Sequence, residues 1–306
     1  MKHSYVNTPS LSTFRSRATR PSRRSFLGVA LGATAALVLT GCAATAPAPT
    51  PEATPSSSIA HVHGIVPDPA GDGFLIGTHD GIYTATADGE LGAPVDGPAF
   101  DAMGLTAIDD VLLASGHPGP DTPPDLGAPH LGIIRSTDGA RTWTPMAFTG
   151  SKDFHVLTAA PDGTVFGLST DSAELLHSPD AGASWVPTGA SVEAFNLTVD
   201  AENRLIASTT DGLLTSADAG ATFGAWPGTP PLIALLNSSP DRKRIVGVAT
   251  DLTVWVTAAG SDEWTQVGAA GDGPEAIAIT NDGDILIAGA SGIVSLPREA
   301  QSAPSE

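Results

Sequence analysis

The sequence predicts an all-β fold built from six similar repeats. A turn signal with an acidic residue recurs in steps of 41, 53, 38, 41 and 41 residues, at Asp68, Asp109, Asp162, Asp200, Asp241 and Asp282. Short apolar runs precede and follow these turns, and no stretch shows a convincing helical period. Units of about 40 residues with several short strands each are typical of propeller blades, so we expect a six-bladed β-propeller.

A second marker supports the same division into blades. It closes the second apolar run of most repeats and recurs every 40 residues, at Asp171, Asp211, Asp251 and Ser291. Asp-Gly between apolar runs favours a tight hairpin, because glycine accepts a positive φ without a Cβ clash. The long 53-residue step contains a Pro/Gly-rich insertion, residues 117–130. The last repeat shows only three strands, within residues 276–296, so its fourth strand comes from residues just before His61 or is missing.

Residues 1–41 have the features of an export signal and are not expected to belong to the fold. They contain six Lys and Arg and no acidic residue, and Ser22-Arg23-Arg24-Ser25-Phe26-Leu27 resembles a twin-arginine motif. An apolar stretch follows, and Leu39-Thr40-Gly41-Cys42 resembles a bacterial lipobox. This resemblance implies that Cys42, the only cysteine, is lipidated and anchors the chain to a membrane.

The remaining boundaries follow from composition. Residues 42–58 are rich in Ala, Pro, Thr and Ser and are expected to form a semi-rigid linker. Residues 59–298 then form the propeller, and residues 299–306 form a short disordered tail. We expect a monomer, exported by the twin-arginine route and held on the outer face of the cytoplasmic membrane or at the cell surface.

The charge of the chain excludes one class of partner. The net charge is -19, and the residues after the signal carry all 33 acids against eight Lys and Arg. Such a surface repels nucleic acid, so no nucleic-acid partner is expected. It suits solubility outside the cell, and it can also attract cations or basic partners.

A third recurring motif indicates a family. Residues 178–185 match the pattern Ser-x-Asp-x-Gly-x-Ser/Thr-Trp, residues 216–223 match it with Phe for Trp, and residues 136–143 match it except for Ala140. The chain therefore resembles the bacterial Asp-box (BNR-repeat) β-propeller lipoproteins, in the group labelled glycosyl-hydrolase-like or exo-α-sialidase-like. The resemblance covers roughly the whole folded part. It implies that the motif is a structural turn between the third and fourth strands of a blade, formed here by Ser136, Asp138, Trp143, Ser178, Asp180, Gly182, Trp185, Ser216, Asp218, Gly220 and Phe223.

Propeller geometry brings a set of polar residues to one face. The first strand of each blade is innermost, and its start and the turn between strands 2 and 3 surround the central pocket, where propellers usually place function. Five histidines are predicted to converge there within blades 1 to 3, at His61, His63, His79, His117 and His155. Asp101, Met103 and Asp153 lie with them, and a ring of further acids is expected from Asp171, Glu193, Asp211, Asp251 and Glu275. His130, in the insertion, and His177, on an outer strand, are not expected to join them.

Two interpretations of this histidine cluster remain open. Uncharged imidazoles with nearby carboxylates and a thioether suit a divalent metal such as copper or zinc. The same residues could instead line the pocket as hydrogen-bonding groups without a metal, because no compact His-x-x-x-His element is present.

The basic residues of the folded part do not fit the sialidase pattern. The sialidases of this superfamily hold the substrate carboxylate with three arginines, whereas Arg204, Arg242 and Arg244 fall at turns on the opposite rim and Lys152 is the only cation expected near the pocket. Sialidase activity is therefore not supported. Another glycosidase reaction needs a pair of carboxylates, for which Asp101, Asp153 and Glu193 are the candidates.

The sequence thus predicts a non-catalytic propeller that binds a small ligand, a metal or a partner protein in the cell envelope. The alternative is a glycoside hydrolase of the sialidase-like superfamily acting on a neutral glycan. A third hypothesis is an assembly factor, since Asp-box-like propellers also resemble the photosystem II assembly factors.

Overall fold

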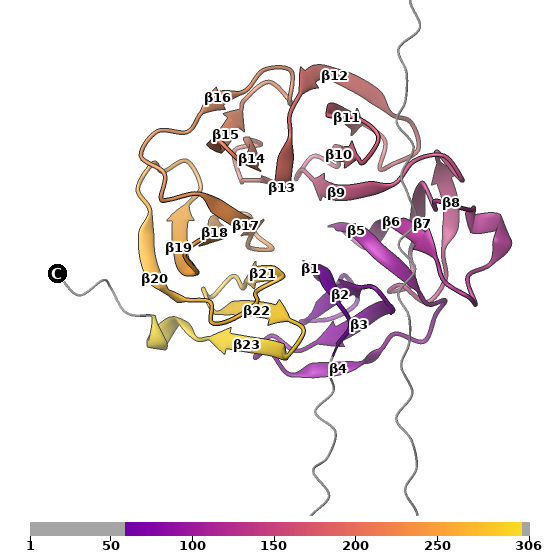
Figure 1. Cartoon of the computed structure of the whole chain (residues 1–306), viewed down its shortest axis with the longest axis horizontal. Coiled ribbons are helices and arrows are strands. Elements are labelled where there is room, and N and C mark those ends of the chain that lie inside the picture. Colours follow the sequence, from indigo (N-terminus) through magenta and orange to yellow (C-terminus); the bar gives the residue numbers. More distant parts are fainter. Residues whose placement is uncertain (1–58, 302–306) are drawn as a thin grey trace, which may run out of the picture. The chain divides into compact units, whose positions relative to one another are not determined.

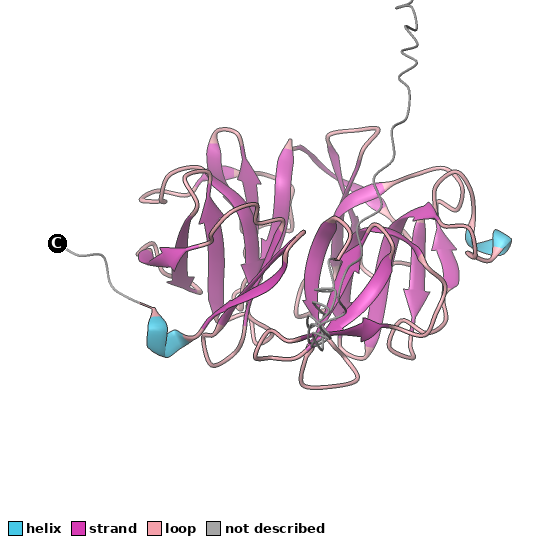
Figure 2. Cartoon of the chain, turned by 60° about the horizontal axis from the view of Figure 1, so that its bottom comes forward, coloured by secondary structure: helices cyan, strands magenta, loops and turns pink. Residues whose placement is uncertain are grey.

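The computed structural model describes residues 59–301, and these form six small antiparallel sheets arranged in a ring (Figure 1). The predicted six-bladed β-propeller is confirmed. The helical elements of the described residues are two single turns, η1 (Pro124–Leu126) and η2 (Arg298–Ala300), and neither could cross a membrane (Figure 2). The predicted signal, Cys42 and the linker to residue 58 lie outside the described residues, as do residues 302–306.

Five blades have four strands and the sixth has three. Blade 1 comprises β1 (Val62–Pro67), β2 (Phe74–Thr78), β3 (Gly81–Ala85) and β4 (Leu91–Pro94); blade 2 comprises β5 (Phe100–Ile108), β6 (Val111–Pro118), β7 (Ile133–Ser136) and β8 (Thr144–Ala147); and blade 3 comprises β9 (Phe154–Ala159), β10 (Val165–Ser169), β11 (Glu174–Ser178) and β12 (Val186–Ser191). Blade 4 comprises β13 (Ala194–Val199), β14 (Leu205–Thr209), β15 (Gly212–Ser216) and β16 (Gly224–Ala225); blade 5 comprises β17 (Ile233–Ser238), β18 (Arg244–Ala249), β19 (Thr253–Ala258) and β20 (Thr265–Ala269); and blade 6 comprises β21 (Ala276–Ile279), β22 (Ile285–Gly289) and β23 (Gly292–Leu296).

Strand order within each blade follows the sequence, with the first strand innermost (Figure 1). The second strand is covered by neighbouring blades on both faces, so every residue of β2, β10, β14 and β22 is buried. This explains why these segments are continuous apolar runs and do not alternate between apolar and polar residues. The apolar residues between blades form the core of the domain.

A β-bulge recurs in the innermost strand of the blades. In blade 1 the pairing of β1 with β2 skips His63, and in blade 3 the pairing of β9 with β10 skips His155. The same interruption falls on Phe195 in blade 4 and on Ala234 in blade 5. A bulge leaves one residue out of the ladder and changes the direction of its side chain, so this shared backbone feature determines which residues face the pocket.

The three turns that resemble the Asp-box connect strands 3 and 4 of blades 2, 3 and 4, as the resemblance implies. In blade 3, Asp180 accepts hydrogen bonds from the Ser178 hydroxyl at 2.9 Å and from the Ser184 backbone amide at 2.7 Å and hydroxyl at 2.6 Å. Trp185 Nε1 donates to the carbonyl of Gly182 at 3.0 Å. All these bonds span four residues or fewer, so they stabilise the turn itself.

Both ends of the propeller meet at blade 6, which has three strands among the described residues. Ile59 precedes β1 and is buried in a cluster with Ala276 and Leu286 of blade 6, so the N-terminal segment helps to close the ring through side-chain packing. At the other end, just after η2, the side-chain amide of Gln301 donates a hydrogen bond to the backbone carbonyl of Gly283 at 2.7 Å. The predicted disordered tail was therefore wrong for residues 299–301, because this turn docks on blade 6.

Candidate metal centre

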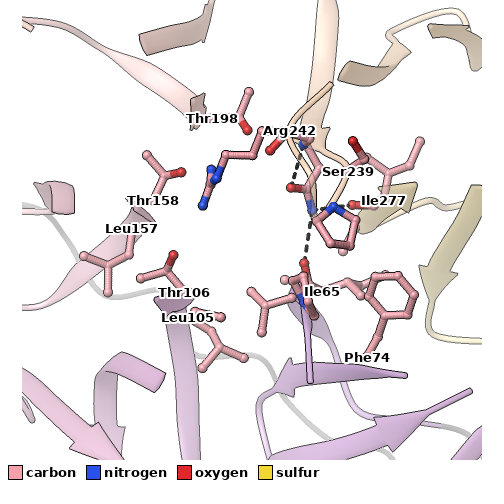
Figure 3. Close-up of a pocket in the computed structure, with 18 of the residues that line it drawn as sticks. Ile65, Phe74, Leu105, Thr106, Leu157, Thr158, Thr198, Ser239, Arg242 and Ile277 are labelled. Carbon is pink, nitrogen blue, oxygen red and sulfur yellow. Dashed lines mark hydrogen bonds between the residues drawn. The ribbon is translucent and has the colours of Figure 1, made fainter. Parts of the chain in front are cut away.

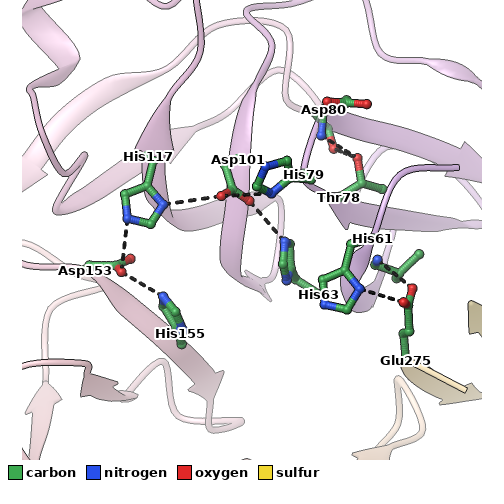
Figure 4. A network of polar contacts seen from close by, with 12 residues as sticks. His61, His63, Thr78, His79, Asp80, Asp101, His117, Asp153, His155 and Glu275 are labelled. Carbon is green, nitrogen blue, oxygen red and sulfur yellow. Dashed lines mark hydrogen bonds and ion pairs between the residues drawn. The ribbon is translucent and has the colours of Figure 1, made fainter. Parts of the chain in front are cut away.

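The structure brings all five predicted pocket histidines into one polar network on blades 1 to 3 (Figure 4). His61 precedes β1, His63 is the bulged residue of β1, and His79 lies in the turn between β2 and β3. His117 lies near the end of β6, and His155 is the bulged residue of β9. The backbone amide of His79 donates to the carbonyl of His61 at 3.0 Å, which holds the first two segments together.

Asp101, on β5, lies at the centre of three imidazoles. Its Oδ1 lies 3.0 Å from Nε2 of His63, and its Oδ2 lies 3.1 Å from Nδ1 of His79 and 3.3 Å from Nδ1 of His117. These residues come from two blades and four strands or turns, so the fold, and not a local sequence motif, assembles them.

Asp153 forms a second centre immediately beside the first. Its Oδ2 lies 2.7 Å from Nε2 of His155 and 3.3 Å from Nε2 of His117. The His117 ring therefore bridges the two carboxylates, with Nδ1 toward Asp101 and Nε2 toward Asp153.

Burial controls the protonation of this network. The side chains of Asp153, His63 and Asp101 are only 5%, 9% and 13% exposed. Burial is the largest effect on the His63 imidazole and lowers its pKa, so the ring is neutral at pH 7 and free to donate a lone pair. For Asp153, burial raises the pKa. The hydrogen bond from His155 and the nearby histidines together outweigh burial, so the pKa is lowered and this carboxyl stays ionised.

Several buried polar atoms in this region have no hydrogen-bond partner among the described residues. They are His63 Nε2, Asp101 Oδ1, Asp153 Oδ1 and His130 Nδ1. His63 Nε2 and Asp101 Oδ1 face each other at 3.0 Å without the alignment of a hydrogen bond. Because an unsatisfied buried polar atom is costly, a cation bound by these atoms would be favourable.

His130 is a site residue that the sequence interpretation missed. Its ring lies 5.3 Å from that of His117, and His117, His130 and Asp153 form a group whose ligand atoms all lie within 4.8 Å of one another. His63, His79 and Asp101 form a second group of the same kind. The insertion that starts at His117 must return to strand 3 of the same blade, and the bond from the Leu131 amide to the carbonyl of Gly116 brings it back beside His117. The return of this insertion toward His117 is the feature from which the position of His130 could have been predicted.

The other predicted pocket acids do not share one role. Glu275 accepts a hydrogen bond from the backbone amide of Val62 at 2.9 Å. Its other carboxylate oxygen lies 2.6 Å from Nδ1 of His61, so it orients that histidine from blade 6. Asp171 is paired with Lys152 at 2.9 Å. Glu193, a candidate carboxylate for glycoside hydrolysis, is exposed and makes no side-chain hydrogen bond or ion pair among the described residues, unlike Asp101 and Asp153.

A central cavity of about 910 Å³ is lined in part by His63, Met103 and His155. The prediction that Arg242 stays away from the pocket was wrong. Arg242 lies in the turn between β17 and β18 with a φ of 58°, and its side chain extends from the opposite rim into the cavity (Figure 3). Placement on a rim turn did not reveal how far such a long side chain reaches.

Comparisons with known proteins identify the fold. No protein-family profile matches the chain, and no curated protein matches it in sequence. Among solved structures, YCF48 bound to D1 peptide matches with a TM-score of 0.50 and 13% identity, over 81% of each chain. The GH74 enzyme of Niastella koreensis matches with a TM-score of 0.54 and 19% identity, over 81% of this chain and 37% of the enzyme. The GH74 xyloglucanase from Xanthomonas campestris matches with a TM-score of 0.50 and 14% identity, over 81% and 53%.

These neighbours are β-propellers, and at such identities the likeness shows the fold alone. The chain spans well under two thirds of the length of the two hydrolases. The neighbours include both a peptide-bound protein and enzymes, so the fold is compatible with binding or with hydrolysis. Function must be inferred from the site itself.

Proposed function

We propose that this chain is a non-catalytic binding propeller of the cell envelope and that its ligand is a divalent transition metal, copper or zinc. The observation that carries the proposal is the pair of adjacent His-His-Asp groups, His63/His79/Asp101 and His117/His130/Asp153. Each group offers two imidazole nitrogens and one carboxylate oxygen, a donor set that suits zinc and copper.

Three features of the site support a metal in preference to a simple hydrogen-bond network. His63 Nε2 and Asp101 Oδ1 make no hydrogen bond among the described residues, and an imidazole nitrogen and a carboxylate oxygen both carry lone pairs that can bind a metal. Burial favours the neutral form of His63, as a metal ligand requires. Glu275 holds His61, whose ring packs edge-on against that of His63 at 4.9 Å between centroids, so it supports a member of the first group from outside.

The same network provides little support for glycoside hydrolysis. A glycosidase needs one carboxylic acid that is protonated near neutral pH, so its pKa must be raised. The histidines around Asp153 lower its pKa, and Asp101 faces three imidazoles. Glu193 is exposed and apart from both. Binding is therefore the better interpretation of these acids.

The proposal includes export and lipid anchoring at Cys42, and membership of the Asp-box propellers. The order of twin arginines, apolar run and lipobox supports the first, and the hydrogen-bonded turns at Asp138, Asp180 and Asp218 support the second. A Cys42→Ala variant expressed in a bacterium that processes lipoproteins should move from the membrane fraction to the soluble exported fraction. Equal membrane association of both forms would contradict the anchor.

Metal content is the decisive measurement. The purified domain, residues 59–301, should be incubated with Zn²⁺ or Cu²⁺, dialysed, and measured by elemental analysis. We expect one to two equivalents of metal per chain, consistent with one or both three-ligand groups being occupied. The double variant His63→Ala/His117→Ala removes one histidine from each group and should lose most of this metal while keeping its circular dichroism spectrum.

The matched control is His177→Ala, which removes a histidine of β11 that stacks on Phe166, outside both groups. It should retain metal at the level of the unmodified domain. If the unmodified domain retains no metal, or if the double variant and the control retain equal amounts, the metal proposal is wrong.

A further inference from the structure

The central cavity contains a second polar group that the metal proposal does not use. Arg242 reaches into it from the rim opposite the histidines, and its guanidinium is half-buried (Figure 3). Its Nη1 donates only one long hydrogen bond, at 3.3 Å, to the carbonyl of Val199. No carboxylate of the described residues lies within ion-pair distance of it, although Arg204 and Lys243 each have an aspartate partner.

Such a guanidinium has an unfavourable environment in the ligand-free protein. Burial lowers its pKa, and no acid lies within ion-pair distance to offset the effect. Because a half-buried charge without a counter-ion is unfavourable, an anionic ligand beside it would be stabilising. Arg242 therefore has the properties of a binding group more than those of a structural one.

Three threonines lie at the same level of the cavity, one from each of three consecutive blades. Thr158 on β9 and Thr198 on β13 each pair with the second residue of the next strand, and Thr106 on β5 pairs with the third residue of β6. They are 6%, 7% and 2% exposed and line the cavity near Arg242 (Figure 3). Within residues 59–301, no hydrogen bond is formed by any of the three hydroxyls, which leaves them available to a ligand.

Blade 5 differs from blades 2 to 4 at this level of the cavity. Asn237 is the equivalent residue of blade 5, and its amide donates to the carbonyls of Ile65 at 3.0 Å and Ile277 at 2.9 Å. Its donor group is thus already used to link blades 1, 5 and 6. The three threonine hydroxyls of blades 2 to 4 and the Arg242 guanidinium thus remain available on this cavity.

We propose that this part of the cavity binds the carboxylate of a small monoanionic molecule with an apolar body. The planar guanidinium of Arg242 would pair with both carboxylate oxygens, and the threonine hydroxyls would donate to the same oxygens. The apolar side chains of Leu105 and Leu157 line the same cavity and would contact the body of the ligand. A cavity of about 910 Å³ has room for a molecule of this size.

The charge balance favours a monoanion over a dianion such as sulfate. Arg242 provides a single positive charge, whereas Asp68, Asp241 and Asp282 also line the cavity toward the same rim. A second negative charge on the ligand would remain uncompensated and would be repelled by these acids.

Calorimetry with benzoate and its neutral analogue benzamide tests the proposal. We expect benzoate to bind the metal-free domain and benzamide to bind at least about tenfold more weakly, since a hydrogen bond to a charged group is lost. Arg242→Gln should weaken benzoate binding by roughly tenfold or more, and Thr158→Val should weaken it severalfold without removing a charge. The control Lys243→Gln makes the same charge change one residue away, on an exposed side chain, and should bind benzoate normally.

Each alternative result would overturn the proposal. Benzoate and benzamide binding equally would show that the carboxylate is not recognised, and unchanged binding by Arg242→Gln would exclude the guanidinium. Sulfate binding more tightly than benzoate would indicate a site for dianions. If Arg242→Gln does not fold, as judged by circular dichroism, Thr158→Val decides: binding equal to that of the unmodified domain would count against the site.

Discussion

Blades 1 and 3 and blades 4 and 5 use the same backbone feature for different purposes. Each innermost strand has a β-bulge at the same place, beside the pocket. In blades 1 and 3 the bulged residues are His63 and His155, which face Asp101 and Asp153. In blades 4 and 5 they are Phe195, which is 49% exposed, and Ala234.

The comparison separates what the fold provides from what the site requires. A bulge or register shift occurs in the innermost strand of five of the six blades, so it is a feature of the propeller fold. The proposed metal donors occur where a histidine of blades 1 to 3 meets the buried carboxylate of Asp101 or Asp153. Half of the ring is therefore a scaffold, and the predictions below test that division.

The largest effect is expected from Asp101→Asn. This carboxylate faces three histidines, so its replacement by an amide should lower the affinity for Zn²⁺ by more than about 100-fold, because even residues outside the ligand shell contribute 10- to 100-fold. Competition titration with a zinc chelator measures the affinity. The free energy of unfolding of the metal-free domain should fall by less than about 1 kcal/mol, since the amide has the same size.

Asp171→Asn is the matched charge control for that experiment. Asp171 is an exposed acid paired with Lys152 outside both metal groups, so its loss should leave zinc affinity unchanged. An equal loss of affinity in the two variants would mean that overall negative charge, and not ligation by Asp101, attracts the metal.

A substitution in the scaffold half, blades 4 to 6, should lower stability without changing the metal content. Gly220, in the turn between β15 and β16, has a φ of 81°, and a Cβ added there would lie 2.7 Å from Cδ2 of Leu175 in the neighbouring blade. Gly220→Ala should therefore lower the free energy of unfolding by roughly 2 to 3 kcal/mol, from backbone strain and overlap together. Urea denaturation of the metal-free domain measures this loss, and metal content should not change.

Gly271→Ala separates the two causes. Gly271 has a similar φ of 72°, but no heavy atom lies within 4 Å of its added Cβ. This variant should lose only the strain contribution, about 1 kcal/mol. If both variants are equally destabilised, the packing of the blade 4 turn against Leu175 contributes nothing.

The architecture was predictable from the sequence because its determinants are local and repeated. The turn markers at Asp200 and Asp241 and the hairpin at Asp211-Gly212 each specify a nearby chain reversal, and their spacing gives the number of blades. The five histidines could be assigned to one face by the same logic. His130 and Arg242 could not, because a loop return and the reach of a long side chain depend on three-dimensional contacts far apart in sequence.

A smaller effect concerns acid stability, to which both halves of the ring should contribute alike. Hydrogen bonds from the hydroxyl and amide of Thr142 lower the pKa of Asp138 in blade 2 to about 2, and Thr222 lowers that of Asp218 in blade 4 to about 2 in the same way, from an ordinary value of 3.8. The unfolded chain therefore binds more protons between these values. Stability should be fully present above about pH 4 and decline as the pH falls toward 2.

Asp138→Asn and Asp218→Asn each remove one titrating group, so each should flatten this decline in urea denaturation of the metal-free domain between about pH 4.5 and 2.5. The two variants should give similar slopes, because the turns have the same hydrogen bonds. A slope that changes for only one of them would show that the turns of the two halves are not equivalent.

The smallest effect is expected from placing a histidine on the bulge of the scaffold half. Phe195→His gives blade 4 the same bulged residue as blades 1 and 3, on a position that is already half exposed, so the free energy of unfolding should change by no more than about 0.5 kcal/mol. Elemental analysis should show no additional metal, because Glu193, two residues away, is exposed and has no histidine partner, unlike the buried Asp101 and Asp153. An extra equivalent of zinc would mean that a bulged histidine is sufficient for binding, and the buried carboxylates would then lose their place as the feature that distinguishes the two halves.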